Sequence, residues 1–137
     1  MDYPDNIEYL LAVLLENEGV GTFATDIFIG KEPNTPDNCI TLYLTGGTPD
    51  DTLSLTNRTN EISTLQVRVR NNDFLTAHAK IEECIAVFGK AKYKTVSDST
   101  GDILLNIWQT SLPNVLIRDT TNRVIMSFDF SCRTERA

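Results

Sequence analysis

Apolar residues recur along this chain with two different periods, and the period changes from one segment to the next. Near the start they recur at helical spacing and form one apolar stripe, made of Ile7, Leu10, Leu11, Leu14 and Leu15. This stripe predicts a helix over about 5–18, capped by Asp5 and ended by Gly19. A second stripe predicts a helix over about 73–88, with these residues on one face: Phe74, Ala77, Ile81, Cys84, Ile85 and Phe88.

Elsewhere apolar and polar residues alternate, which is the period of a strand with one buried face. Leu65, Val67 and Val69 alternate with polar neighbours and predict the clearest strand. The predicted strands cover residues 25–29, 39–45, 63–70, 103–110, 115–119 and 124–131. We expect Gly46 and Gly47 to break the second strand, and the final RTERA to form a frayed tail.

The order of these elements indicates a fold class. One helix precedes three strands, and a second helix precedes three more. Short connections at 111–114 and 120–123 favour antiparallel pairing of the last strands. We therefore expect an α+β fold, a mostly antiparallel sheet with two helices packed on one face, formed by residues 1–137 as a single domain.

Composition narrows the classes of function. Of 137 residues, 12 are Lys or Arg and 19 are Asp or Glu, so the formal net charge is −7. Such a surface repels phosphate and anionic lipid, which disfavours nucleic-acid and membrane binding. The start lacks the basic residues of a signal peptide, and no apolar run approaches the ~20 residues of a membrane span. We expect a cytosolic protein with free thiols at Cys39, Cys84 and Cys132.

Candidate catalytic chemistry is sparse. His78 is the only histidine, and Cys84 lies roughly 240° around the predicted helix from it, so the two side chains do not face each other. The sequence TGGTPDD lacks the lysine of a phosphate-binding loop, and Asp37, Asp50 and Asp51 lack the spacing of a calcium loop. We therefore expect no catalytic, cofactor-binding or metal-binding residues, and a protein that is not an enzyme.

Two other features have more than one interpretation. Arg68 and Arg70 project from the same face of a strand, opposite the predicted core. They are either solvated charges that discourage sheet pairing, or contacts to acidic groups of a neighbouring subunit. The polar stretch 46–61 either contains a small extra strand around Leu53 and Leu55 or reaches out to another molecule.

Three segments together resemble a known family. They are PDNCITLYLTGG (36–47), TLQVRVRNND (64–73) and AHAKIEECIAVF (77–88). Their order is similar to that of the tail-terminator, or minor capsid (tail completion), proteins of long-tailed bacteriophages, and the likeness spans roughly residues 5–90. The resemblance implies a structural virion protein that forms a hexameric ring, caps the tail tube, stops its polymerisation and provides the joint to the head.

The resemblance also implies partners and a location. The partners are further copies of the chain, the major tail tube protein and a head-completion protein, and DNA passes through the ring without specific binding. No cofactor and no membrane are involved, and the protein is made in the host cytoplasm and ends in the tail or neck of the virion. A head-to-tail connector component and a small soluble regulatory binding module are the alternatives.

The polar stretch 46–61 and the two arginines of the predicted strand over 63–70 are the segments that we expect at the contact between subunits. We expect this contact to be made by Thr48, Asp50, Asp51, Thr52, Arg68 and Arg70.

Overall fold

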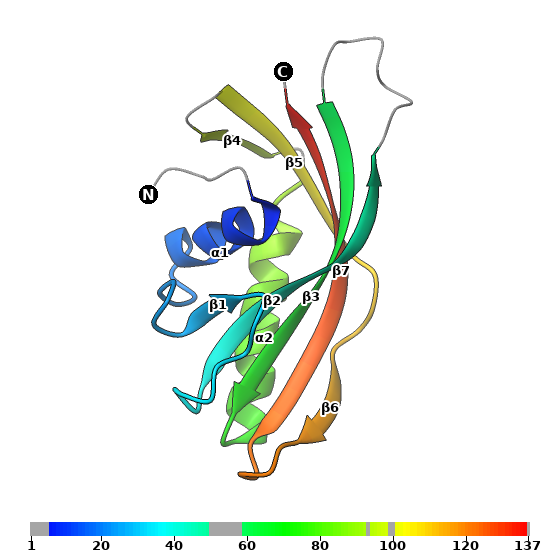
Figure 1. Cartoon of the computed structure of the whole chain (residues 1–137). Coiled ribbons are helices and arrows are strands. Elements are labelled where there is room, and N and C mark those ends of the chain that lie inside the picture. Colours follow the sequence, from blue (N-terminus) through cyan, green and yellow to red (C-terminus); the bar gives the residue numbers. More distant parts are fainter. Residues whose placement is uncertain (1–5, 50–58, 93, 99–100, 137) are drawn as a thin grey trace.

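The computed structural model describes residues 6–49, 59–92, 94–98 and 101–136 (Figure 1). It contains two helices, α1 (Ile7–Asn17) and α2 (Phe74–Gly89). The strands are β1 (Ile27–Ile29), β2 (Cys39–Pro49), β3 (Thr59–Asn71), β4 (Lys94–Asp98), β5 (Gly101–Gln109), β6 (Asn114–Arg118) and β7 (Val124–Arg136).

All the strands belong to one seven-stranded sheet in the order β1-β2-β3-β7-β5-β4, with β6 also paired to β7. Only the β1–β2 pair is parallel among the pairs of the described strands. The predicted α+β class with a mostly antiparallel sheet is confirmed. The last strand, β7, lies at the centre, since β3 pairs with its whole length along one edge while β6 and β5 share the other edge.

One buried cluster joins the helices to the sheet. The α1 leucines at positions 10, 11, 14 and 15 are buried, as the stripe predicts, and α2 adds Ala77, Ile81, Cys84 and Phe88. The ring of Phe88 stacks on Phe130, with centroids 4.6 Å apart, so α2 is held over the middle of the sheet. Burial raises the pKa of the Cys84 and Cys132 thiols to about 12, which keeps both protonated at neutral pH.

The caps of the helices satisfy their first free N–H groups. The Asn6 side chain accepts a hydrogen bond from the Tyr9 amide at 3.0 Å, so Asn6 is the cap of α1, where we expected Asp5, which lies outside the described residues. Asp73 caps α2, because its carboxylate accepts bonds from the Thr76 amide at 3.0 Å and the Thr76 hydroxyl at 2.7 Å.

Several predicted boundaries were wrong, each because the chain keeps pairing where its local composition suggested an end. Strand β2 has a bulge between Leu44 and Gly46 and continues through Gly46 and Gly47, which pair with Thr64 and Ser63, so the glycines do not break the strand. Leu44, at the start of this bulge, is half exposed.

The expected C-terminal tail is also strand. Residues of RTERA pair with β3 on one side and β5 on the other, and Thr134 is buried. Strand β4 lies between the predicted helix over 73–88 and the predicted strand over 103–110, where we predicted no strand, and its Val96 is buried against the main cluster.

Candidate assembly surface

Arg68 lies in a polar network that crosses three strands. Its Nε donates to the Gln66 side chain at 2.8 Å, and its guanidinium carbon lies 5.0 Å from the centroid of the Tyr43 ring on β2. Gln66 in turn donates to Asp129 on β7 at 3.4 Å. The side chain is half-buried, so the network positions one guanidinium without removing it from the surface. Arg68 can therefore still meet an acidic group from outside.

Arg70 has a different environment, although it lies only two residues further along β3. It is 3% exposed, and its guanidinium donates to the carbonyl oxygens of Pro36 at 2.7 Å and Asp37 at 3.1 Å. The interpretation of Arg70 as a solvated charge was wrong, because the connection between β1 and β2 covers it. Arg70 holds that connection against the sheet.

A second buried arginine, Arg123, also binds the β1–β2 connection. Arg123, just before β7, donates to the Asn34 carbonyl at 2.7 Å and pairs with Asp37 at 3.2 Å. Its Nε also pairs with Asp119 at 2.8 Å. Sequence analysis missed Arg123, because one arginine at the end of a turn has no pattern that distinguishes it from a solvated charge.

The carboxylate of Asp119 is unusually well satisfied. It accepts bonds from the backbone N–H groups of Arg123 and Thr121, from the Thr121 hydroxyl and from the Arg123 side chain. These bonds, led by the one from the Arg123 amide, lower the pKa of Asp119 to about 2. The turn between β6 and β7 is thereby tied to the β1–β2 connection.

The loop that we expected at a subunit contact joins the ends of β2 and β3. Thr48 lies in β2, and its backbone pairs with Ile62 of β3, while Asp50, Asp51 and Thr52 lie outside the described residues. The last described pair is Pro49 with Glu61. In Figure 1 this end of the β2–β3 pair lies at the upper right, away from both helices.

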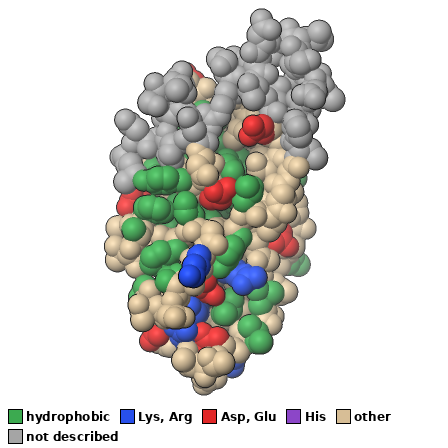
Figure 2. Space-filling view, viewed as in Figure 1, with side chains coloured by type: hydrophobic (Ala, Val, Ile, Leu, Met, Phe, Trp, Pro, Cys, Tyr) green, Lys and Arg blue, Asp and Glu red, His purple; other side chains and the backbone are tan. Residues whose placement is uncertain are grey.

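An apolar strand is exposed at the opposite end of the sheet. Every residue of β6 is exposed, and Leu112 just before it is 81% exposed. Figure 2 shows hydrophobic side chains at the lower right of the molecule, where Figure 1 places β6. Exposed apolar groups gathered on one strand are typical of a surface that another molecule covers.

The single histidine of the chain lies on the outside of α2. His78 is exposed on α2, with its Nε2 3.7 Å from Glu82 and its ring stacked 6.4 Å from Phe74. Among the described residues no group of three or more His, Cys, Asp or Glu side chains is placed to hold a metal ion.

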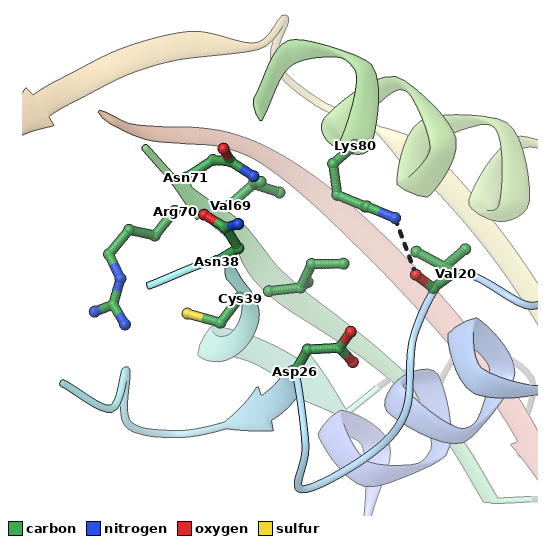
Figure 3. A pocket seen from close by; sticks show the side chains of 9 residues that line it. Val20, Asp26, Asn38, Cys39, Val69, Arg70, Asn71 and Lys80 are labelled. Carbon is green, nitrogen blue, oxygen red and sulfur yellow. Dashed lines mark hydrogen bonds between the residues drawn. The ribbon is translucent and has the colours of Figure 1, made fainter. Parts of the chain in front are cut away.

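The cavity beside Cys39 is also small. Its volume is about 60 Å³, far below the ~300 Å³ of small-molecule sites. Figure 3 shows Lys80 donating to the Val20 carbonyl across this cavity, at 3.2 Å, while the Arg70 guanidinium points away from the other lining residues. The space suits one or two water molecules.

Within the described residues, neither helix combines the length and the apolar character needed to cross a membrane.

Comparison with known proteins identifies the family. The family model described as "Bacteriophage tail terminator protein" matches residues 14–136. The chain belongs to this family and is therefore a structural protein of a phage tail. The family is one of structural proteins, not of enzymes.

The other comparisons add less. One similar solved structure is a chain of the "Virion of native gene transfer agent (GTA) particle", with 16% identity and a TM-score of 0.49. The match covers 92% of this chain and 84% of that one. No curated protein matches this sequence.

Proposed function

We propose that the protein is a ring-forming tail terminator, which caps the phage tail tube, stops its polymerisation and provides the joint to the head. The observation that carries this proposal is the family match over residues 14–136. The surface agrees with it, because β6 exposes apolar side chains that another molecule can cover. Its action is steric: a ring that covers the tube end leaves no surface for the next tube subunit.

The ring is a homo-hexamer that forms on the end of the tube. Its partners are the major tail tube protein on one side and a head-completion protein on the other, and it lies in the neck of the virion after synthesis in the host cytoplasm. Single contacts between subunits are weak, and a template that presents matching sites makes the assembled ring stable. A net charge of −7 offers few cations to DNA, so DNA passes through the ring without specific binding.

The contact between subunits includes the β2–β3 loop and Arg68 on the sheet surface. We place Thr48, Asp50, Asp51 and Thr52 of one subunit and Arg68 of the next at this contact. Arg68 is suited to it because its guanidinium is positioned by Gln66 and Tyr43 and is still partly exposed. Arg70 contributes by holding the β1–β2 connection in place.

Charge reversal at Arg68 tests both the ring and this contact. Arg68→Glu is expected to reduce ring formation at least tenfold without unfolding the subunit, and Lys31→Glu, the same charge change at an exposed site, is the control. Light scattering measures the mass of the free protein, and negative-stain microscopy counts capped tube ends.

The outcomes separate the claims. Normal rings from Arg68→Glu would remove Arg68 from the contact. Wild-type protein that neither forms rings nor caps tubes would overturn the proposed function. Capture of a head-side ring without the tube would favour a connector, and a stable monomer that binds a soluble regulator would favour a binding module.

A further inference from the structure

Strand β6 is exposed on both of its faces. The exposed fractions of its apolar side chains are 47% for Val115, 41% for Leu116 and 62% for Ile117. A sheet normally buries at least one face of each strand, as the other strands here do. In a folded subunit alone, this strand therefore leaves apolar surface in water that a partner can cover.

The free edge of β6 is also poorly protected. It pairs with β7 along one edge, and no described strand pairs with the other. Natural sheet edges are blunted by charges, by short strands or by bulges. The edge strand β4 has Lys94, and β1 is three residues long. Strand β6 is five residues long and has a bulge between Val115 and Ile117, but it carries only one charge, Arg118, at its end.

Charge indicates which partner fits this surface. From Ile103 to Arg118 the sequence contains no Asp or Glu, although the whole chain contains 19. Two copies of a chain with net charge −7 repel each other over most of their surfaces. The acid-free segment that ends in β6 therefore adds no negative charge that would oppose the approach of a second acidic copy.

We propose that β6, together with Leu112, is a docking surface for a second copy of this chain, and that it packs on the first turn of α2 of that copy. This inference rests on the proposed ring. A closed ring of more than two subunits requires a heterologous contact, in which two different surfaces meet. The surface that receives β6 must therefore be another part of the chain.

The first turn of α2 has the matching properties. Outside residues 112–117, the exposed large apolar side chains of the described chain are Leu44, Phe74 and Leu75. Phe74 and Leu75 are neighbours, and Leu75 is 74% exposed. The adjacent cap residue Asp73 is exposed and acidic, so it offers a negative charge to Arg118 at the end of β6.

The contact is made mainly by side chains. The bulge after Val115 interrupts the regular spacing of β6, so its free edge does not offer a continuous ladder of hydrogen bonds. A few apolar side chains on a short strand give a small interface, and small interfaces are weak. Weak pairwise contact agrees with subunits that close into a ring only when several contacts form together.

Substitution to aspartate tests the surface. Ile117→Asp and Leu75→Asp are each expected to shift the assembly midpoint to at least tenfold higher concentration, because each places a charge in an apolar contact. Leu44→Asp is the matched control, since Leu44 is 50% exposed and apolar but lies on neither surface. Circular dichroism and thermal melting check that the variants fold, and light scattering over a concentration series measures the assembly.

Cross-linking of single-cysteine additions gives a second, independent readout. Ile117→Cys mixed with Leu75→Cys is expected to form a disulfide between subunits of the ring, whereas Ile117→Cys mixed with Leu44→Cys is not. The three native cysteines are buried, so they compete little.

Each outcome decides one question. Rings with normal midpoints from both aspartate variants would overturn the inference and leave the proposed function intact. A disulfide-linked dimer from Ile117→Cys alone would also overturn it, because it would show β6 packing on β6. Wild-type protein that forms no ring with or without the tube would overturn the proposed function itself.

Discussion

At the scale of single residues, charged side chains shape this molecule by holding its connections. Arg70 and Arg123 both donate to backbone carbonyls of the β1–β2 connection, at Pro36, Asp37 and Asn34. Charged donors bonded to carbonyl oxygens make stronger bonds than neutral donors do. The connection, which contains no helix or strand, is thereby attached to β3 and to the start of β7.

This attachment predicts that substituting Arg70 lowers the free energy of unfolding more than substituting Arg68, although both lie on β3. Arg70→Met keeps the apolar stem but removes both bonds to the connection, so it is expected to lower the free energy of unfolding by about 2 kcal/mol. Arg68→Met is the matched control. It removes the half-exposed contacts of Arg68 with Gln66 and Tyr43 and is expected to lower the free energy of unfolding by less than about 1 kcal/mol. Urea unfolding measures both, and equal costs would contradict the buried role of Arg70.

Asp119 predicts a dependence on pH. Its pKa lies at about 2 in the folded protein against an ordinary value of 3.8, because several donors favour the carboxylate. A carboxyl group whose pKa is lower in the folded protein stabilises the fold at pH values above its ordinary pKa. This stabilisation is lost as the pH falls toward 2. We expect the stability difference between wild type and Asp119→Asn to be full at pH 5 and to shrink between pH 4 and pH 2. Urea unfolding over this range measures it, and a constant difference would contradict the assignment.

The arginines also show what the sequence can predict at this scale. Alternation along β3 placed Arg68 and Arg70 correctly on the face opposite Leu65 and Val67. It could not show that a segment from residues 34–38 covers one arginine and not the other, because that contact joins positions more than thirty residues apart.

At the scale of elements, Gly46 and Gly47 let β2 stay paired with β3 beyond the bulge that follows Leu44. The φ angles are +146° at Gly46 and +143° at Gly47, a region that favours glycine. A Cβ at Gly47 would clash with the Ile62 carbonyl oxygen. Glycine is required there because the partner strand approaches so closely, not because the strand ends.

Gly47→Ala is therefore expected to loosen the extended part of the β2–β3 pair. The strained φ of the new alanine and its close contact with the Ile62 carbonyl are together expected to lower the free energy of unfolding by about 2 kcal/mol or more. Hydrogen exchange is expected to speed up at the amides of residues 61–64, with little change in α2. Gly89→Ala is the control, because nothing from elsewhere in the chain lies within 4 Å of the position that its Cβ would take, and helix ends tolerate alanine. Unchanged exchange in Gly47→Ala would contradict the role of this glycine.

Elements were predictable where the apolar period was strong. Both helices and the central part of each long strand follow from it, whereas β4 and the end of β7 do not. The segment KTVSD is stabilised as strand β4 by pairing with β5, and RTER at the end of β7 by pairing with β3 and β5. Both segments contain too few apolar residues to show an apolar period in the sequence.

At the scale of the whole molecule, the order of the strands decides which surfaces remain open. The last strand of the chain, β7, lies between β3 and β5, and this could not be predicted because long-range pairing leaves no local signal. Since β5 and β6 share one edge of β7, no other described strand pairs with the outer edge of β6. The surface that we assign to a second copy is therefore a consequence of topology, although its apolar residues are visible in the sequence.

Net charge makes ring assembly dependent on salt. Copies that each carry −7 repel one another over distances comparable with the Debye length, which falls from ~30 Å at 10 mM salt to ~8 Å at 150 mM. Because the β6 contact is mainly apolar, added salt is expected to screen the repulsion more than it weakens the contact. The midpoint concentration for ring formation should therefore fall severalfold over this range.

Sedimentation at a fixed protein concentration near the wild-type midpoint measures this dependence, and Ile117→Asp, whose midpoint is expected to lie at least tenfold higher, is the control. If added salt dissolves the rings instead, attraction between opposite charges, such as Arg118 and Asp73, exceeds the repulsion between the acidic surfaces. The direction of the salt dependence thus distinguishes a ring held by apolar packing from a ring held by ion pairs.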